Sequence, residues 1–244
     1  MLDLLMNIIC LPIEPLFVSM NIMEEKVFKK EQVNMNNIPN NTVLPPVQVL
    51  TQRMLRQNMN VFYPVVAGFN NQYVQHVINM TILNLVNKLI ADQGYYTNPG
   101  TQVTGWYELK TNERGVLSLN IGNYAYPPMA AHGMTYIKSL TFDTQTGRLY
   151  QLKDLFKPGS DYVKVLSDNI KVQIKERDIT LLNGFTAIRP DQDYYIADKA
   201  LVIYFQLYEI TPYAFGFPMF PISEYELQDI IRENGPLDKM AVSN

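Results

Sequence analysis

The sequence predicts an α+β fold in which two long helices and a short C-terminal helix pack on an antiparallel sheet. Apolar residues recur with a helical period over 71–92 and again over 161–177. Between and after these segments, short runs of alternating apolar and polar residues are separated by turn sequences. Strands joined by such short turns pair in antiparallel fashion, which excludes a doubly wound parallel sheet.

Residues 1–58 are predicted to be a poorly ordered N-terminal extension and linker. The first twenty residues are apolar, but Asp3 precedes any basic residue, and Pro12 and Pro15 interrupt the run. This pattern matches neither a secretory signal nor a membrane-spanning segment. On this interpretation the protein is not exported and is cytoplasmic by sequence, with spore or envelope association as the alternative.

The first half of the fold begins with one edge strand expected at 47–54. The first long helix follows, where Asn70 or Asn71 can cap the start and Gly94 the end. Its apolar stripe is broad enough to require a sheet beneath it, and comprises Val74, Ile78, Ile82, Leu85 and Leu89.

Three strands are expected next, at 103–110, 116–123 and 135–143. Gly115 can take the positive φ that the turn between the first two requires. In the second strand Leu117, Leu119 and Ile121 share one face, whereas Ser118 and Asn120 share the other. This alternation predicts a sheet with one wetter side.

Asp143 opens a turn that ends in glycine and is expected to bond the backbone two residues on. A short strand at 148–151 should follow. The second long helix at 161–177 carries an inner stripe of Val163, Leu166, Ile170 and Ile174.

The C-terminal part is expected to contain a hairpin of 194–196 and 200–207. Ser223 and Glu226 form a capping box for a last helix that Asn234-Gly235-Pro236 ends. Residues 237–244 then form a tail.

Composition excludes several functional classes. A net charge of −3 without a basic cluster argues against nucleic acid as a partner. The single cysteine, Cys10, excludes an intramolecular disulfide, and two histidines with one cysteine cannot build an ordinary zinc site. No phosphate-binding loop or dinucleotide motif occurs, so no cofactor or metal is expected.

Six segments in a fixed order resemble the PdaC/RsiV-like domain family. They are Tyr63-Pro64 with Ile78-Asn79 in the following helix, 115–119 leading into Tyr124-Ala125-Tyr126, Ala131-His132-Gly133, 141–147, 152–156 and 208–216. The resemblance implies an N-terminal part at 59–126 and a C-terminal part at 127–236 that continues the same sheet. Where the family carries glycines before Ala-His-Gly, this chain has Pro127-Pro128-Met129-Ala130.

Relatives in this family include the extracytoplasmic part of an anti-sigma factor that senses lysozyme and the non-catalytic region of a peptidoglycan deacetylase. The resemblance therefore implies a non-enzymatic binding or sensing module, with a protein or a peptidoglycan-type envelope glycan as partner. It transfers no deacetylase activity, because that chemistry belongs to a separate domain.

The candidate binding residues are His132, Tyr208, Glu209 and Tyr213, which are expected to meet in one partly buried polar cluster. His132 either contacts a ligand or fixes its loop. Glu209 either pairs with His132 or accepts backbone N–H bonds from the loop that contains Pro212. No catalytic residue is assigned. The alternatives are a small hydrolase using His132 with Glu209 or Asp143, and a cytoplasmic or spore structural protein.

Overall fold

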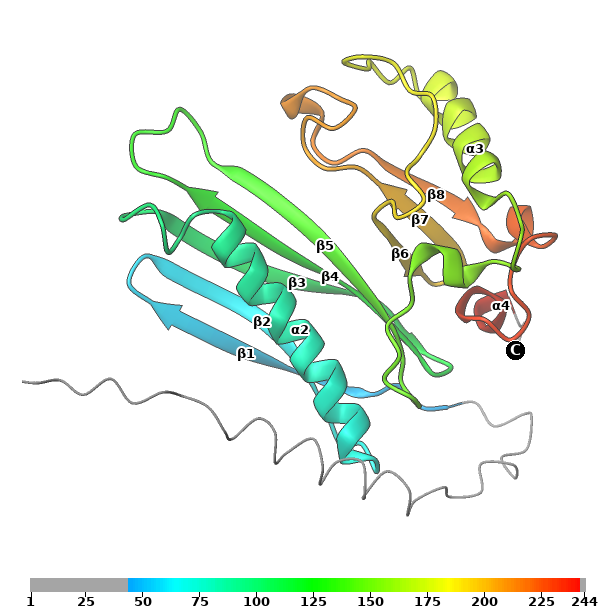
Figure 1. Ribbon diagram of the computed structural model, residues 1–244, viewed down its shortest axis with the longest axis horizontal. Helices are drawn as coiled ribbons and strands as arrows, with labels where there is room; N and C mark the ends of the chain where they lie inside the picture. Colours follow the sequence, from blue (N-terminus) through cyan, green and yellow to red (C-terminus); the bar gives the residue numbers. More distant parts are fainter. Residues whose placement is uncertain (1–43, 242–244) are drawn as a thin grey trace, which may run out of the picture. The chain divides into compact units, whose positions relative to one another are not determined.

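Two sheets, rather than one, carry the helices of this protein. A computed structural model describes residues 44–241 (Figure 1), so most of the expected extension and the last three residues of the expected tail lie outside the described part. The larger sheet contains β1 (Gln48–Arg56), β2 (Met59–Ala67), β3 (Gln102–Glu113), β4 (Val116–Tyr126) and β5 (Met134–Asp143) in that order. The smaller sheet contains β6 (Tyr194–Ala197), β7 (Ala200–Tyr204) and β8 (Met219–Ser223).

The larger sheet is mixed, which corrects the prediction of a purely antiparallel sheet. β2 and β3 run parallel over Met59–Val61 and Val103–Gly105, whereas the other neighbours in this sheet are antiparallel. Helix α2 (Gln72–Asp92) lies between these two strands in the sequence and acts as the crossover. A crossover helix returns the chain to the same end of the sheet, so the next strand runs parallel.

Helix α2 covers one face of the larger sheet, as its apolar stripe predicts. The Asn71 side chain caps the helix by accepting the N–H groups of Tyr73 and Val74. Asn79 holds the helix to β2, because its amide bonds both the N–H and the carbonyl of Val66, at 2.8 and 3.0 Å. The fully buried side chains of this helix are Val74, Ile78, Ile82, Val86, Leu89 and Ile90, while Leu85 is only partly buried.

The smaller sheet has its own helix, so the two long helices do not share one sheet. Helix α3 (Tyr162–Glu176) begins after Asp161, whose side chain accepts the Lys164 N–H, and packs beside β8 (Figure 1). Leu166 and Ile170 are buried in a core formed with the smaller sheet. β5 continues the larger sheet, and the chain after it builds the second layer.

Two short predicted elements are wrong. Residues 148–151 form one isolated bridge, Phe142 to Leu149, instead of a strand, and a 3-10 turn follows at Leu152–Leu155. Ser223 does cap the next turn, but that turn is a 3-10 segment, Glu224–Leu227. The last helix, α4 (Pro236–Ala241), begins at the proline that was expected to end it, and it buries Leu237 and Met240. Proline suits a first helical turn, where its missing N–H is not needed.

The turn at Asp143 has the predicted structure. One carboxylate oxygen accepts the N–H groups of Gln145 and Thr146, both at 2.9 Å, and the other accepts the Tyr150 hydroxyl at 3.0 Å. Burial opposes ionisation of Asp143, but these bonds and the nearby Lys239 ammonium together hold its pKa below the ordinary value.

The polar face of β4 is buried instead of wet. Ser118 and Asn120 are 0% and 2% exposed, because the smaller sheet covers this face. The Ser118 hydroxyl accepts the N–H of Ile196 in β6 at 3.0 Å and lies 2.9 Å from the Thr141 hydroxyl. The Thr111 hydroxyl donates to the Ile196 carbonyl at 2.9 Å. Side chains of the larger sheet therefore bond the main chain of the smaller one.

A small apolar cluster of Ile137, Tyr195, Val202 and Tyr204 completes the contact between the sheets. The Tyr204 hydroxyl lies 2.6 Å from that of Ser139 in β5. Burial, reinforced by the nearby Asp193 carboxylate, raises the pKa of Tyr204 well above its ordinary value, so this hydroxyl keeps its proton for bonding. In the described residues no helix is long and apolar enough to cross a membrane.

The first prediction compares two residues of the α2 stripe. Replacing the fully buried Ile82 with Ala should lower the free energy of unfolding by about 2–5 kcal/mol, because the sheet beneath cannot close the cavity. Leu85→Ala should cost roughly half as much or less, since Leu85 already keeps part of its surface in water. Urea denaturation measures both, and an equal loss for the two variants would contradict this burial pattern.

Candidate functional site

Two loops bring the aromatic signature residues together. The loop between β4 and β5 carries His132, and the loop between β7 and β8 carries Tyr208 and Tyr213. The ring centroids of His132 and Tyr213 are 5.0 Å apart, and those of Tyr213 and Tyr208 are 5.4 Å apart. Both pairs are tilted, at 37° and 36°. We call these three rings the aromatic stack.

Local contacts fix the shape of the first loop. Gly133 packs so closely on Tyr124 that a Cβ at this position would overlap the tyrosine ring. The Tyr126 hydroxyl donates to the Ala130 carbonyl at 2.9 Å. The His132 Nδ1 atom lies 2.9 Å from the Gly133 carbonyl, to which it can bond only as a donor. His132 is exposed.

The second loop holds an unusual backbone conformation at an exposed tyrosine. Tyr208 has a φ of 65° and is 46% exposed. A non-glycine residue in this region costs about 1–3 kcal/mol and persists only where its surroundings enforce it. A 3-10 turn follows at Tyr213–Phe215, and Gly216 closes the loop with a φ of 80°.

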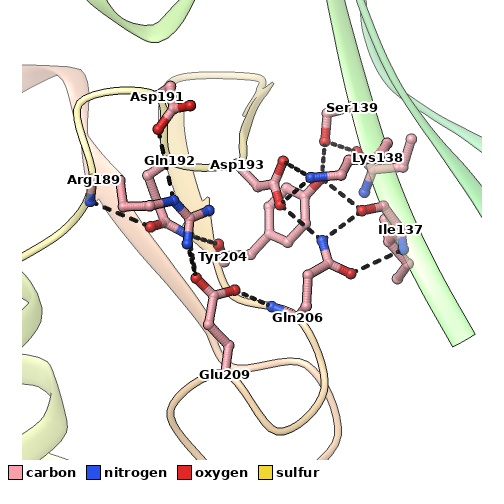
Figure 2. Close-up of polar contacts among 11 residues, drawn as sticks. Ile137, Lys138, Ser139, Arg189, Asp191, Gln192, Asp193, Tyr204, Gln206 and Glu209 are labelled. Atoms are coloured by element: carbon pink, nitrogen blue, oxygen red, sulfur yellow. Dashed lines mark hydrogen bonds and ion pairs between the residues drawn. The ribbon is translucent and has the colours of Figure 1, made fainter. Parts of the chain in front are cut away.

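Glu209 holds the backbone of Tyr208 in this conformation. It does not pair with His132. Figure 2 shows its carboxylate bonded to neighbours on two sides, as one part of a polar network. One oxygen accepts from the Arg189 guanidinium and, at 3.3 Å, from the Gln192 amide. The other accepts the N–H of Gln206 at 2.7 Å, which closes the turn containing Tyr208.

The same network extends to the larger sheet (Figure 2). The Gln206 amide donates to the Ile137 carbonyl at 2.7 Å and accepts the Ile137 N–H at 3.2 Å. It also donates to Asp193 at 2.8 Å, and Asp193 is ion-paired with Lys138 of β5 at 2.8 Å. We call these contacts, together with those of Glu209, the docking network, because they join the second loop to β5.

The structure therefore separates the four predicted site residues. His132, Tyr208 and Tyr213 come together, but in an aromatic stack instead of a polar cluster; His132 and Tyr208 are exposed and Tyr213 is partly buried. Glu209 belongs to the docking network and accepts a backbone N–H, although from Gln206 and not from the proline-containing part of the loop. Sequence reasoning missed Gln192, Asp193 and Gln206. The first two lie in a segment without a periodic pattern, and Gln206 lies in the run 200–207 that was expected to be all strand, whereas β7 ends at Tyr204.

An open hollow of about 380 Å³ lies beside His132, between the end of α2 and the start of β5, lined by Asp92, Gln93, Gly94, Ala125, Pro127, His132, Met134 and Tyr136. Its carboxylate, Asp92, is ion-paired with Lys88 at 2.6 Å. Within residues 44–241, no three His, Cys, Asp or Glu side chains are grouped as metal ligands.

The hydrolase alternative required His132 to converge with Glu209 or Asp143. Glu209 is bonded elsewhere, as described above. His132 precedes the first residue of β5 and Asp143 is its last, so the strand separates them by about 30 Å. Among the described residues, no direct hydrogen bond joins His132 to either carboxylate.

Comparisons with known proteins agree with the resemblance. Residues 153–224 match the family described as protein of unknown function DUF3298. The chain is 29% identical to the anti-sigma-V factor RsiV of Bacillus subtilis (strain 168) over 183 residues, which are 68% of this chain. The match spans 63% of RsiV, less than two thirds of that relative.

Two solved structures have a similar fold. A DUF3298 family member from Bacteroides fragilis NCTC 9343 has a TM-score of 0.58 at 13% identity, and the match covers 82% of this chain and 97% of that one. A DUF3298 family protein from Pseudomonas aeruginosa PAO1 has a TM-score of 0.54 at 16% identity, with 78% and 95% covered. These structures confirm the α+β fold.

The second prediction concerns the close contact in the first loop. Gly133→Ala should lower the free energy of unfolding by about 1–3 kcal/mol, because the added methyl group overlaps the Tyr124 ring. In a Tyr124→Leu background the same change should cost less than about 0.5 kcal/mol. Chemical denaturation of the four proteins tests this, and an unchanged cost in that background would contradict the contact.

The third prediction assigns Glu209 to the docking network. A double-mutant cycle of Arg189→Gln with Glu209→Gln should give a coupling of roughly 0.5–1 kcal/mol in unfolding free energy. The matched cycle of His132→Ala with Glu209→Gln should give a coupling within about 0.3–0.5 kcal/mol of zero, because the two side chains share no bond. A larger coupling between His132 and Glu209 would instead support the predicted polar cluster that contains both side chains.

Proposed function

We propose that this protein is a non-enzymatic binding module of the PdaC/RsiV-like type and that its aromatic stack contacts a protein partner. The match of residues 153–224 to DUF3298 and the similarity to RsiV support this proposal. The relative RsiV is named as an anti-sigma factor, which supports a regulatory role for this module.

The observation that carries this proposal is the exposure of large side chains on the two loops. Tyr208 is 46% exposed, Phe215 is 43% exposed and Met129 is fully exposed. Together with the exposed His132, they place aromatic and methionine side chains in water. Such residues are enriched at the energetic centres of protein interfaces.

The loops also support binding because their contacts hold them in place before any partner arrives. Gly133 fits against Tyr124, and Glu209 bonds the backbone at Gln206. A surface ordered in advance loses less conformational entropy on association than a flexible one. The positive φ of Tyr208 is consistent with a side chain whose direction is functional.

A peptidoglycan-type glycan is the second candidate partner. Exposed tyrosine rings can stack on sugar rings, and Tyr208 presents such a ring. A protein is favoured because Met129 and Phe215 add apolar surface without a polar group to bond sugar hydroxyls.

The fourth prediction tests the stack directly. We expect immobilised protein to capture a lysozyme-type protein, and Tyr213→Ala and Tyr208→Ala to weaken this binding at least tenfold, since each removes a ring of the stack. Tyr225→Ala is the matched control, because Tyr225 is 55% exposed and lies on a different segment, Glu224–Leu227. Calorimetric titration measures the affinities.

Peptidoglycan fragments serve as the parallel probe. Binding of fragments alone, lost in Tyr208→Ala, would replace the protein partner with the glycan. Binding of neither probe would remove the envelope-related function, and fractionation of the native host would then test the cytoplasmic or spore structural role.

A further inference from the structure

Three edge strands of this fold have their outward backbone groups protected. On β5, Gln206 bonds both the N–H and the carbonyl of Ile137. On β6, Ser118 and Thr111 bond the N–H and the carbonyl of Ile196. An open strand edge is a template for pairing with another chain, and such side-chain contacts block it.

The edge of β8 is protected in the same way by helix α3. Gln173 donates to the carbonyl of Pro221 at 2.8 Å, and Arg177 donates to that of Met219 at 2.8 Å. Pro221 itself has no N–H to offer. On each of these three edges, side chains therefore bond outward backbone groups of the strand.

β1 is the exception. It is the outer strand of the larger sheet and pairs only with β2. Seven of its nine residues are exposed, including Leu50 at 42% and Leu55 at 62%. Among the described residues, no side chain bonds its outward backbone groups, and it contains no proline, lysine or inward-pointing charge.

The sequence of β1 is self-complementary in its polarity. Its sequence is Gln-Val-Leu-Thr-Gln-Arg-Met-Leu-Arg. One polar residue, two apolar, three polar, two apolar and one polar residue follow each other, so the pattern is the same in both directions from the central residue, Gln52. Antiparallel pairing of two copies about Gln52 places opposite residues whose numbers sum to 104. Val49 then meets Leu55, Leu50 meets Met54, and each remaining polar residue meets a polar one.

We propose that the protein forms a two-fold symmetric dimer in which β1 pairs antiparallel with β1 of a second copy about Gln52. The pairing bonds the free edge and covers the exposed leucines. Opposite residues have the same parity in this register, so their side chains lie on the same face and can contact one another.

The two arginines of β1 do not oppose this arrangement. Arg56 meets Gln48 of the second copy and Arg53 meets Thr51, so no like charges lie directly opposite. Arg53 is also turned toward β2, where it donates to the Asn60 side chain at 2.8 Å and lies 5.4 Å above the Phe62 ring. Its charge is therefore directed away from the open edge.

The fifth prediction uses register-specific crosslinking of the full chain. In a Cys10→Ser background, Gln52→Cys should form a disulfide-linked dimer under mild oxidation, because each Gln52 faces its own copy at about 4.5–5.5 Å between Cβ atoms. Gln48→Cys is the matched control. It should crosslink at least tenfold more slowly, since eight residues separate the two cysteines along the paired strands, about 26 Å.

Sedimentation of the same full chain gives an independent readout. The unmodified protein should show a concentration-dependent monomer–dimer equilibrium, and Gln52→Lys should weaken it at least tenfold by placing two ammonium groups opposite each other. Asn87→Lys, at an exposed position on α2, should leave it unchanged. A monomer at every concentration, or a dimer indifferent to Gln52→Lys, would overturn the proposal, as would equal crosslinking by the two cysteine variants.

Discussion

The rest of the structure depends on how β6 is bonded to the larger sheet. The Ile196 N–H and carbonyl have no strand partner on that side, and they are bonded instead by the hydroxyls of Ser118 and Thr111. A buried backbone group left unbonded costs about 1–3 kcal/mol, so displacement of β6 would be unfavourable at both atoms. Because β6 pairs with β7, these two hydroxyls also position the strand from which the Tyr208 loop departs.

In the two segments 131–133 and 208–216, some residues hold the loops in place and others are exposed to solvent. Gly133 and Glu209 do not face solvent as ligand-binding groups would; one admits the Tyr124 ring and the other closes the turn at Gln206. Their neighbours, His132 and Tyr208, then project into water. A charged residue such as Glu209 can thus fix the backbone of a loop whose exposed residue, Tyr208, is aromatic.

Sequence reasoning succeeded where the determinants are local. The apolar stripes defined both long helices, and an asparagine cap was expected at the start of the first, where Asn71 accepts the N–H groups. It failed where the outcome depends on distant partners: Ser118 has the same polarity whether its face meets water or β6. Glu209 likewise gives no local sign that Arg189, twenty residues earlier, will bind it. The parallel pairing of β2 with β3 was missed because no strand was predicted at 59–67, ahead of the helix that was.

The proposed dimer and the proposed binding surface use opposite edges of the same sheet. β1 forms one edge, whereas β5 follows the loop that carries His132 and forms the other. Pairing through β1 would therefore leave both aromatic stacks exposed and join the two larger sheets through their free edges. Two stacks held in one rigid body can engage a repeated or surface-bound partner with higher avidity than either alone, without any new contact. In this proposal the open edge of β1 joins the two copies, and the aromatic rings of both copies contact the partner.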